Sequence, residues 1–382
     1  MQNNNKKIRK IDLFKLNYDA AELEAVKDVL NSKWVSMGPK SQQLESEFSK
    51  YIGTKYGVAL SNCTAALHLA LRMLNIGEGD EVILPSLTFV ATANAVLYVG
   101  ARPVFADVTD VDRWTISPDD IEKKITSRTR AIIVMHYAGF GCEMDQIMDI
   151  AGKYNLKIIE DACHGPGGVW QNKRLGTFGD ISCYSFYSNK NMSTAEGGML
   201  LTDNAQYRDS AMLLRSHGMT TVAHERNSGA EFYDVVELGY NYRLDDIHSA
   251  LGLVQLKKLT RDIETRNRSA KRYRENLCKI EGVSDVFKNY TGLSTYYIFP
   301  VLLTSANRSR VRAKLEELGI QTSIHYPPVH LFKHFSDYRV SLPCTEDICQ
   351  RSLSLPIYAN MADEDVDYVC HSLSSVLEQE AG

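Results

Sequence analysis

The segment 185–198 reads SFYSNKNMSTAEGG and places a single lysine, Lys190, in a polar stretch between two apolar runs. The runs Ile181–Phe186 and Gly198–Leu201 have the length and apolar content of short strands. A lysine held between strands and flanked by small residues can approach a carbonyl group and form a Schiff base with it. A solvated surface lysine would leave the same local pattern, so the interpretation depends on a second motif upstream.

That second motif reads LKIIEDACHG at residues 156–165 and ends an apolar strand on an aspartate, Asp161. In open α/β sheets the carboxyl ends of the strands line the ligand crevice. An aspartate there can pair with the protonated nitrogen of a pyridine ring, and a lysine with such an aspartate is the combination that pyridoxal phosphate requires. Taken alone, Asp161 reads equally well as a helix N-cap. Together with Lys190 it favours the cofactor.

A third motif reads GVALSNCTAALHLAL at residues 57–71 and predicts a strand, a turn and a helix. Thr64 and Ala65 fall in the first turn of this helix, where free N–H groups and the helix dipole favour an anion. The hydroxyls of Thr64 and Ser185 add further donors for a phosphate group. Ordinary helix capping produces the same pattern, so this motif counts only in combination with the other two.

Composition sets the broad class of the protein. The chain has 382 residues, 44% of them hydrophobic and 24% charged, which is typical of a globular protein with two domains. The net charge of −4 gives no reason to expect nucleic acid or an anionic membrane as a partner. The eight cysteines form no Cys-x-x-Cys pair, and no long apolar segment is present, so we expect reduced thiols, no metal site and a cytoplasmic location.

Strand-like and helix-like segments alternate through the first part of the chain. This βαβ repetition predicts an α/β fold with a mostly parallel sheet flanked by helices. The strands are expected at 58–60, 81–84, 104–106, 131–136 and 156–160, and the helices at 19–30, 43–52, 64–74, 89–98 and 144–154.

The pattern changes near residue 251, where a long charged helix is expected over Leu251–Arg268. A strand at Tyr296–Leu303 and a helix at Ser309–Leu318 follow it. We therefore predict a large cofactor-binding domain at residues 1–255, including the N-terminal helices, and a smaller α+β C-terminal domain at residues 256–382. A long loop is expected at 220–233.

With these motifs in place, the whole chain resembles the nucleotide-sugar aminotransferases, also called the DegT/StrS family, of the fold-type I pyridoxal-phosphate enzymes. Two departures stand out: Cys63 replaces a frequent glycine in the phosphate turn, and Ala195 stands where glycine is common. The landmarks of the resemblance are GP at 38–39, TAALH at 64–68, PSLTFVAT at 85–92, EDA at 160–162, SF at 185–186, Lys190, EGG at 196–198, RSHG at 215–218, GYNYR at 239–243 and HYPP at 325–328.

The resemblance implies a role for each matching residue. Lys190 would link covalently to pyridoxal phosphate and later move a proton between the α-carbon of the amino acid and the cofactor. Asp161 would keep the pyridine nitrogen protonated, so that the ring acts as an electron sink. The phosphate would be held by Thr64, Ala65 and Ser185.

The resemblance implies roles for four further residues, three of which have an alternative reading. Phe89 would stack on the cofactor ring, or else is a core aromatic at the start of a helix. His164 would contact the ring hydroxyl, or else is a polar-turn histidine. Asn241 would reach the phosphate of a second subunit, which predicts a homodimer with shared active sites. Arg243 would bind the carboxylate of the amino donor, or else forms a salt bridge at the interface.

The resemblance predicts a ping-pong transaminase that takes its amino group from an amino acid, L-glutamate being expected, and gives it to a nucleotide-linked keto-deoxysugar. The segment His325–His330 is made rigid by two prolines and suits sugar recognition by His325 and His330, although a solvated surface turn would read the same. It resembles members that aminate C4 of a 4-keto-6-deoxyhexose.

The alternatives are amination at C3, a sugar dehydratase, a non-catalytic regulatory protein and a fold-type I enzyme acting on amino acids. Dehydratases of this kind usually carry histidine in place of the lysine, and a regulatory protein would be expected to lose Lys190 or Asp161. Gly239–Arg243 and His325–Pro328 favour the sugar family over enzymes that act on amino acids.

Overall fold

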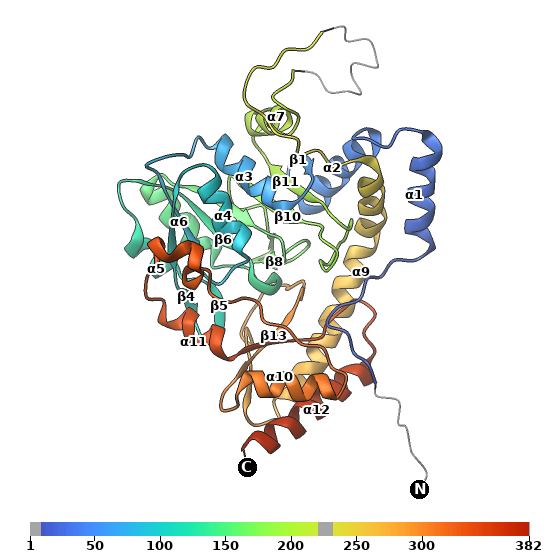
Figure 1. Cartoon of the computed structure of the whole chain (residues 1–382), viewed down its shortest axis with the longest axis vertical. Coiled ribbons are helices and arrows are strands. Elements are labelled where there is room, and N and C mark those ends of the chain that lie inside the picture. Colours follow the sequence, from blue (N-terminus) through green and yellow to red (C-terminus); the bar gives the residue numbers. More distant parts are fainter. Residues whose placement is uncertain (1–8, 221–231, 382) are drawn as a thin grey trace.

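The computed structural model describes residues 9–220 and 232–381. A large α/β body carries a smaller C-terminal part, and one long helix connects the two (Figure 1). Most of the loop expected at 220–233 falls outside the described residues.

A seven-stranded sheet forms the centre of the large body, in the order β1-β11-β10-β7-β6-β2-β3. Its pairings are parallel except those of β11, which runs antiparallel to both β1 and β10. The predicted mostly parallel sheet is therefore confirmed. The strands are β1 (Tyr56–Leu60), β2 (Glu81–Pro85), β3 (Arg102–Ala106), β6 (Thr129–Met135), β7 (Lys157–Asp161), β10 (Ile181–Ser185) and β11 (Gly198–Thr202).

Helices cover both faces of this sheet, because successive strand side chains point to opposite sides and both sets are apolar. Ile133 and Ile159 enter a core with α3 and α4, whereas Ile132 and Ile158 enter a core with α6. The helices of the large body are α1 (Ala20–Ser32), α2 (Pro39–Ile52), α3 (Cys63–Met73), α4 (Val90–Tyr98), α5 (Pro118–Lys124), α6 (Met144–Tyr154) and α7 (Ala205–Leu214).

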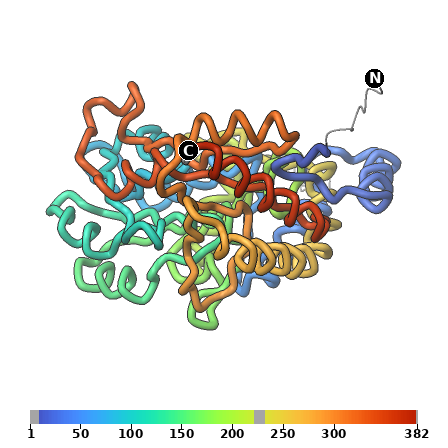
Figure 2. The backbone as a smooth tube through the Cα atoms, turned by 90° about the horizontal axis from the view of Figure 1, so that it is seen from below, coloured from blue at the N-terminus to red at the C-terminus, as the bar shows by residue number. Residues whose placement is uncertain are grey.

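The C-terminal part is built on the long helix α9 (Asp246–Leu277), which packs against α12 (Asp363–Ala381) (Figure 2). The predicted boundary at residue 255 lies inside α9, and the division of the chain into two domains at that residue stays a prediction. The remaining elements of this part are β12 (Val283–Asp285), β13 (Phe299–Leu303), β14 (Ser352–Leu355), α10 (Arg308–Glu317) and α11 (Pro343–Arg351).

The short strands lie outside the central sheet and form two small hairpins, β4 (Val108–Asp110) with β5 (Arg113–Ile116) and β8 (Val169–Trp170) with β9 (Lys173–Arg174). None of the helices in the described part of the chain combines the length and the apolar character that crossing a bilayer requires.

Candidate active site

The candidate active site lies where two neighbouring parallel strands end. Strands β7 and β10 pair with Cys183 opposite Asp161, so Asp161 and Ser185 leave the sheet at the same edge. The connection from β10 to β11 then brings Lys190 to this edge. A cavity of about 320 Å³ opens there. The predicted site residues that line it are Thr64, Phe89, Asp161, His164, Ser185, Lys190 and His325.

The Lys190 amine lies 4.1 Å from the centroid of the Tyr297 ring. Burial lowers the pKa of this amine, but Tyr297 and nearby acidic groups, including Asp161, raise it, and the net pKa lies above its usual range. The free amine is therefore an ammonium at neutral pH. It must lose a proton before it can attack a carbonyl group.

Asp161 is buried and held in a fixed orientation by two donors. Its Oδ2 accepts a hydrogen bond of 2.8 Å from the Thr92 hydroxyl, and its Oδ1 accepts one of 3.2 Å from the N–H of Cys163. Thr92 is itself buried in α4 and contacts the Thr88 hydroxyl. A hydroxyl and a backbone N–H keep a carboxylate in place without neutralising its charge, which leaves that charge available for a cationic ring nitrogen.

The phosphate end of the cavity differs from the prediction at one residue. Asn62 is the N-cap of α3, and its Oδ1 accepts a 2.8 Å hydrogen bond from the N–H of Ala65. That N–H is therefore already engaged, and Ala65 does not line the cavity, whereas Thr64 and Ser185 do. Asn62 also lines the cavity and was missed, although an asparagine before a helix is a recognisable cap signal.

Aromatic residues form one side of the cavity. Phe89 is 56% exposed, which rules out the core-aromatic alternative, and its ring lies 5.9 Å from that of Tyr326. His164 is buried and stacks on Tyr297 with ring centroids 4.0 Å apart. Tyr297 and Tyr326 also line the cavity. Tyr326 belongs to the motif at 325–328 but was not singled out there, and Tyr297 lies in no motif.

The two cavity histidines are neutral. Burial, with a further contribution from the nearby Lys190, lowers the pKa of His164 well below its usual range and that of His325 to about 4. The Nδ1 of His164 accepts a hydrogen bond from a backbone N–H at 3.3 Å, which leaves its Nε2 proton for the Tyr326 hydroxyl at 3.0 Å. The Nδ1 of His325 lies 2.9 Å from the hydroxyl of Ser354. These imidazoles therefore act as hydrogen-bonding groups rather than as charges.

The structure does not support a substrate-binding role for His330. Its ring is fully buried, with Nδ1 2.6 Å from the Ser86 hydroxyl and Nε2 3.3 Å from a carboxylate oxygen of Glu346. It does not line the cavity. A buried polar ring needs partners, and these two residues, distant in sequence, supply them.

We expect His330→Ala to lower the free energy of unfolding by about 2–4 kcal/mol, because it leaves a cavity and removes the partner of the buried Ser86 hydroxyl. Urea unfolding measures this change. His334→Ala is the matched control, since His334 is exposed on the next short helix and should change stability by less than about 0.5 kcal/mol. A normal stability together with a large rise in KM for His330→Ala would restore the substrate-binding role.

Asn241 and Arg243 lie in a segment that runs beside the end of β1. Isolated bridges pair Asn241 with Ser216 and Arg243 with Leu60. Asn241 is exposed, and neither residue lines the cavity of its own subunit. The structure therefore does not bring them together with Lys190 within one chain.

The two departures from the family pattern differ in how well they suit the local backbone. Ala195 has φ of +69°, so this position does require the left-handed conformation that favours glycine. Cys63 is the first residue of α3, where a Cβ is tolerated.

The cavity residues fit pyridoxal phosphate. A lysine amine, a fixed carboxylate, an exposed aromatic ring and two hydroxyls converge from separate elements. One buried acceptor of the cavity wall, Oδ1 of Asn189, also has no hydrogen-bond partner among the described residues. The donor set provides one group for each part of the cofactor: its aldehyde, its ring nitrogen, its ring face and its phosphate.

Comparison with known proteins gives a consistent result. The model of the DegT/DnrJ/EryC1/StrS aminotransferase family matches residues 17–374. The uncharacterized protein MJ1066 of Methanocaldococcus jannaschii is 39% identical over 369 residues, which covers 94% of this chain and 95% of that protein.

Two solved structures superpose along nearly the whole chain. Helicobacter pylori PseC, an aminotransferase involved in the biosynthesis of pseudoaminic acid, has a TM-score of 0.91 and 29% identity, covering 97% of this chain and 100% of its own. The PLP form of the putative sugar aminotransferase Spr1654 from Streptococcus pneumoniae has a TM-score of 0.90 and 28% identity, covering 97% and 99%.

These findings confirm the predicted fold type and enzyme class. Spr1654 was solved in both a PLP form and a PMP form, the aldehyde and amine states of one cofactor, and the predicted cofactor is confirmed on this basis. The family model covers far more than half of the chain. The protein therefore belongs to the DegT/DnrJ/EryC1/StrS aminotransferase family.

Proposed function

We propose that the protein transfers an amino group from an amino acid, L-glutamate, to C4 of a nucleotide-linked 4-keto-6-deoxyhexose. The convergence of Lys190 and Asp161 in one cavity carries this proposal. Pyridoxal phosphate, when bound, supplies the electron sink that makes an α-carbon proton acidic. The chain supplies the groups that hold the cofactor, move the proton and select the two substrates.

In this proposal Lys190 and Asp161 handle separate protons. The Nζ of Lys190 takes the proton from the α-carbon of the amino acid and returns a proton in the reverse half-reaction. The carboxylate of Asp161 holds a proton at the ring nitrogen of the cofactor, and Thr92 keeps that carboxylate in place. The donor and the acceptor occupy one cavity in turn, which gives ping-pong kinetics.

The sugar is recognised by neutral hydrogen-bonding groups. His325 and Tyr326 line the cavity beside Lys190, and the depressed pKa of His325 keeps its imidazole uncharged. Uncharged donors and acceptors suit sugar hydroxyls, because a buried polar group left without a partner is penalised. Since His330 does not line the cavity, we assign sugar recognition to His325 and Tyr326, and the preference for C4 rests on the resemblance of the segment His325–His330 to members that aminate C4.

We expect purified enzyme with glutamate and a nucleotide-linked 4-keto-6-deoxyhexose to form a 4-amino sugar. A panel of UDP-, dTDP- and GDP-linked substrates identifies the nucleotide, and NMR of the product locates the nitrogen. The 3-keto isomers serve as the matched comparison. Nitrogen at C3, or no reaction with any 4-keto sugar of the panel, would reject C4 amination.

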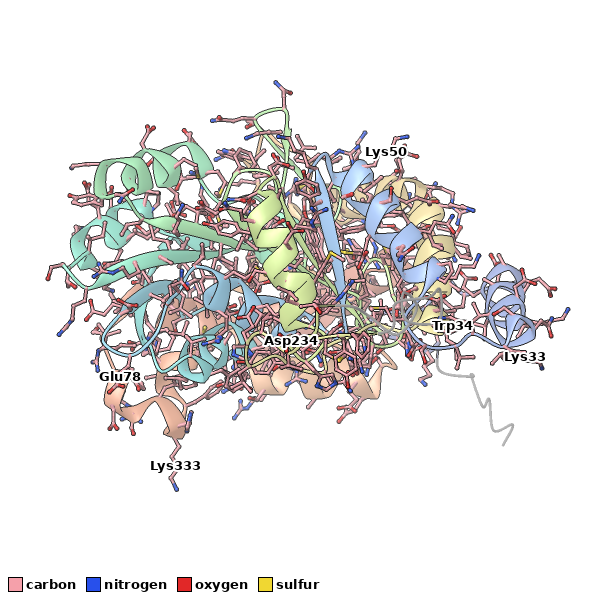
Figure 3. The ribbon with its side chains drawn as sticks, turned by 90° about the horizontal axis from the view of Figure 1, so that it is seen from above. Lys33, Trp34, Lys50, Glu78, Asp234 and Lys333 are labelled. Atoms are coloured by element: carbon pink, nitrogen blue, oxygen red, sulfur yellow. The ribbon has the colours of Figure 1, made fainter. Side chains whose placement is uncertain are left out.

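We further propose that two subunits share their active sites, with Asn241 of one subunit reaching the phosphate bound by the other. Several apolar side chains are exposed in the described part of the single chain. On α1, Leu23 is 71% exposed and Leu30 is 51% exposed, although the sequence pattern assigns them to an apolar face. Residues 232–238, which extend beyond α7 (Figure 1; Asp234 is labelled in Figure 3), expose Phe232, Val235, Val236 and Leu238. Surfaces of this kind are typical of a subunit interface.

Mixing two inactive variants tests the shared site. A Lys190→Ala protomer and an Asn241→Ala protomer should together form heterodimers with one intact site, restoring about a quarter of the wild-type activity in a random equal mixture. A mixture of Lys190→Ala with Asp161→Asn is the matched control, because both residues act in the same subunit and no intact site forms. Equal activity of the two mixtures, or a fully active monomer in sedimentation, would contradict the proposal.

A further inference from the structure

Two cysteine thiols meet inside the cofactor cavity. The Sγ atoms of Cys63 and Cys163 are 2.9 Å apart, although the residues are separated by 100 positions in the sequence. Cys63 begins α3 at the phosphate turn, and Cys163 follows the end of β7. Both line the cavity, and neither has a role in the proposed transamination.

The two thiols connect the parts of the site that hold the two ends of the cofactor. Cys163 donates its N–H to Oδ1 of Asp161, so a shift of Cys163 moves the carboxylate that serves the ring nitrogen. Cys63 follows Asn62, the N-cap of helix α3, which begins at the phosphate turn. A bond between the two sulfurs would draw these walls of the cavity toward each other.

We propose that Cys63 and Cys163 are a reversible oxidation site, at which a disulfide forms in the cofactor-free protein and weakens the binding of pyridoxal phosphate. With hydrogen peroxide as the oxidant, the two thiols lose two protons and two electrons, the Sγ–Sγ bond forms, the O–O bond breaks and two molecules of water leave. A dithiol reductant reverses the step by thiol–disulfide exchange.

The geometry requires only a small movement. A disulfide has an S–S distance of about 2.05 Å, so the sulfurs must approach by about 0.9 Å. Burial raises the pKa of the Cys63 thiol to about 11, whereas the contact with Cys63 and then burial raise the pKa of the Cys163 thiol well above its usual range. Because the thiolate is the reactive form, oxidation should become faster as the pH rises. Bound cofactor occupies the same cavity and should slow the oxidation of the two thiols.

Peptide mapping tests the cross-link without any sugar substrate, so it is independent of the proposed function. The apo and holo proteins are treated with hydrogen peroxide in the presence of a chelator, alkylated and digested with trypsin. We expect residues 56–72, which contain Cys63, joined to residues 158–173, which contain Cys163, mainly in the apo sample. A cross-link to residues 175–190, which contain Cys183, or loss of thiols without any cross-link, would overturn the proposal.

Cofactor titration tests the consequence. A misplacement of about 1 Å in an active site can lower a reaction rate about a hundredfold. For displaced cofactor contacts we expect the oxidised apo protein to bind pyridoxal phosphate about tenfold or more weakly until a dithiol is added. Cys63→Ser should show no difference between oxidised and reduced samples, each compared with its own untreated state. Cys278→Ser, which changes an exposed thiol, should behave like the wild type. Equal affinity of oxidised and reduced wild type would contradict the proposed effect on the cofactor.

Discussion

Replacing Lys190 with alanine is expected to lower turnover by about a thousandfold or more, because one amine both links covalently to the cofactor and moves the proton. Steady-state assays with glutamate and the keto sugar measure the loss. Lys50→Ala is the matched control, since Lys50 is exposed on α2 (Figure 3) and should leave turnover within about twofold.

A second measurement separates catalysis from folding. The Lys190→Ala protein should keep its thermal unfolding temperature, because the wild-type Lys190 amine contacts the Tyr297 ring and forms no salt bridge within the described part of the chain. Turnover within tenfold of wild type would mean that another group performs the proton transfer.

The second large effect is expected at Asp161. Asp161→Asn keeps the shape of the side chain and can keep its contact with Thr92, but it removes the negative charge that holds a proton on the ring nitrogen. We expect turnover to fall by about a hundredfold or more with little change in stability. Asp161→Glu, which keeps the charge but displaces it, should retain more activity than the asparagine variant. Near-normal turnover of Asp161→Asn would refute the assigned role.

Much of the fold was predictable because strand and helix periods are local. The helix at Met144–Tyr154 was predicted with the bounds that the structure has. The direction of β11 was not predictable, since the polar connection that carries Lys190 leaves the strand order open. Helix α2 begins at Pro39 rather than at 43, because proline suits the first turn of a helix and the apolar pattern does not mark it.

The placement of Lys190 and Asp161 in one cavity was predictable because each lies in a motif where residue type and position coincide, and their catalytic roles stay predictions. Tyr297 could not be found, because its part of the chain carries no motif and reaches the cavity only through tertiary packing, whereas Tyr326 lies in a recognised motif in which only the histidines were singled out. The same limit explains His330, whose buried ring is bonded to Ser86 and Glu346, residues that its own motif does not contain. For Ala65, capping by Asn62 occupied the N–H that the motif had assigned to the phosphate.

Borohydride reduction of the holoenzyme followed by peptide mapping tests the central claim most directly. Reduction fixes the cofactor on the lysine that holds it, and a modified Lys190 resists trypsin. The account predicts a single labelled peptide spanning residues 175–208. In Lys190→Ala the same peptide should carry no label. A label on any other lysine of the wild-type protein would contradict it.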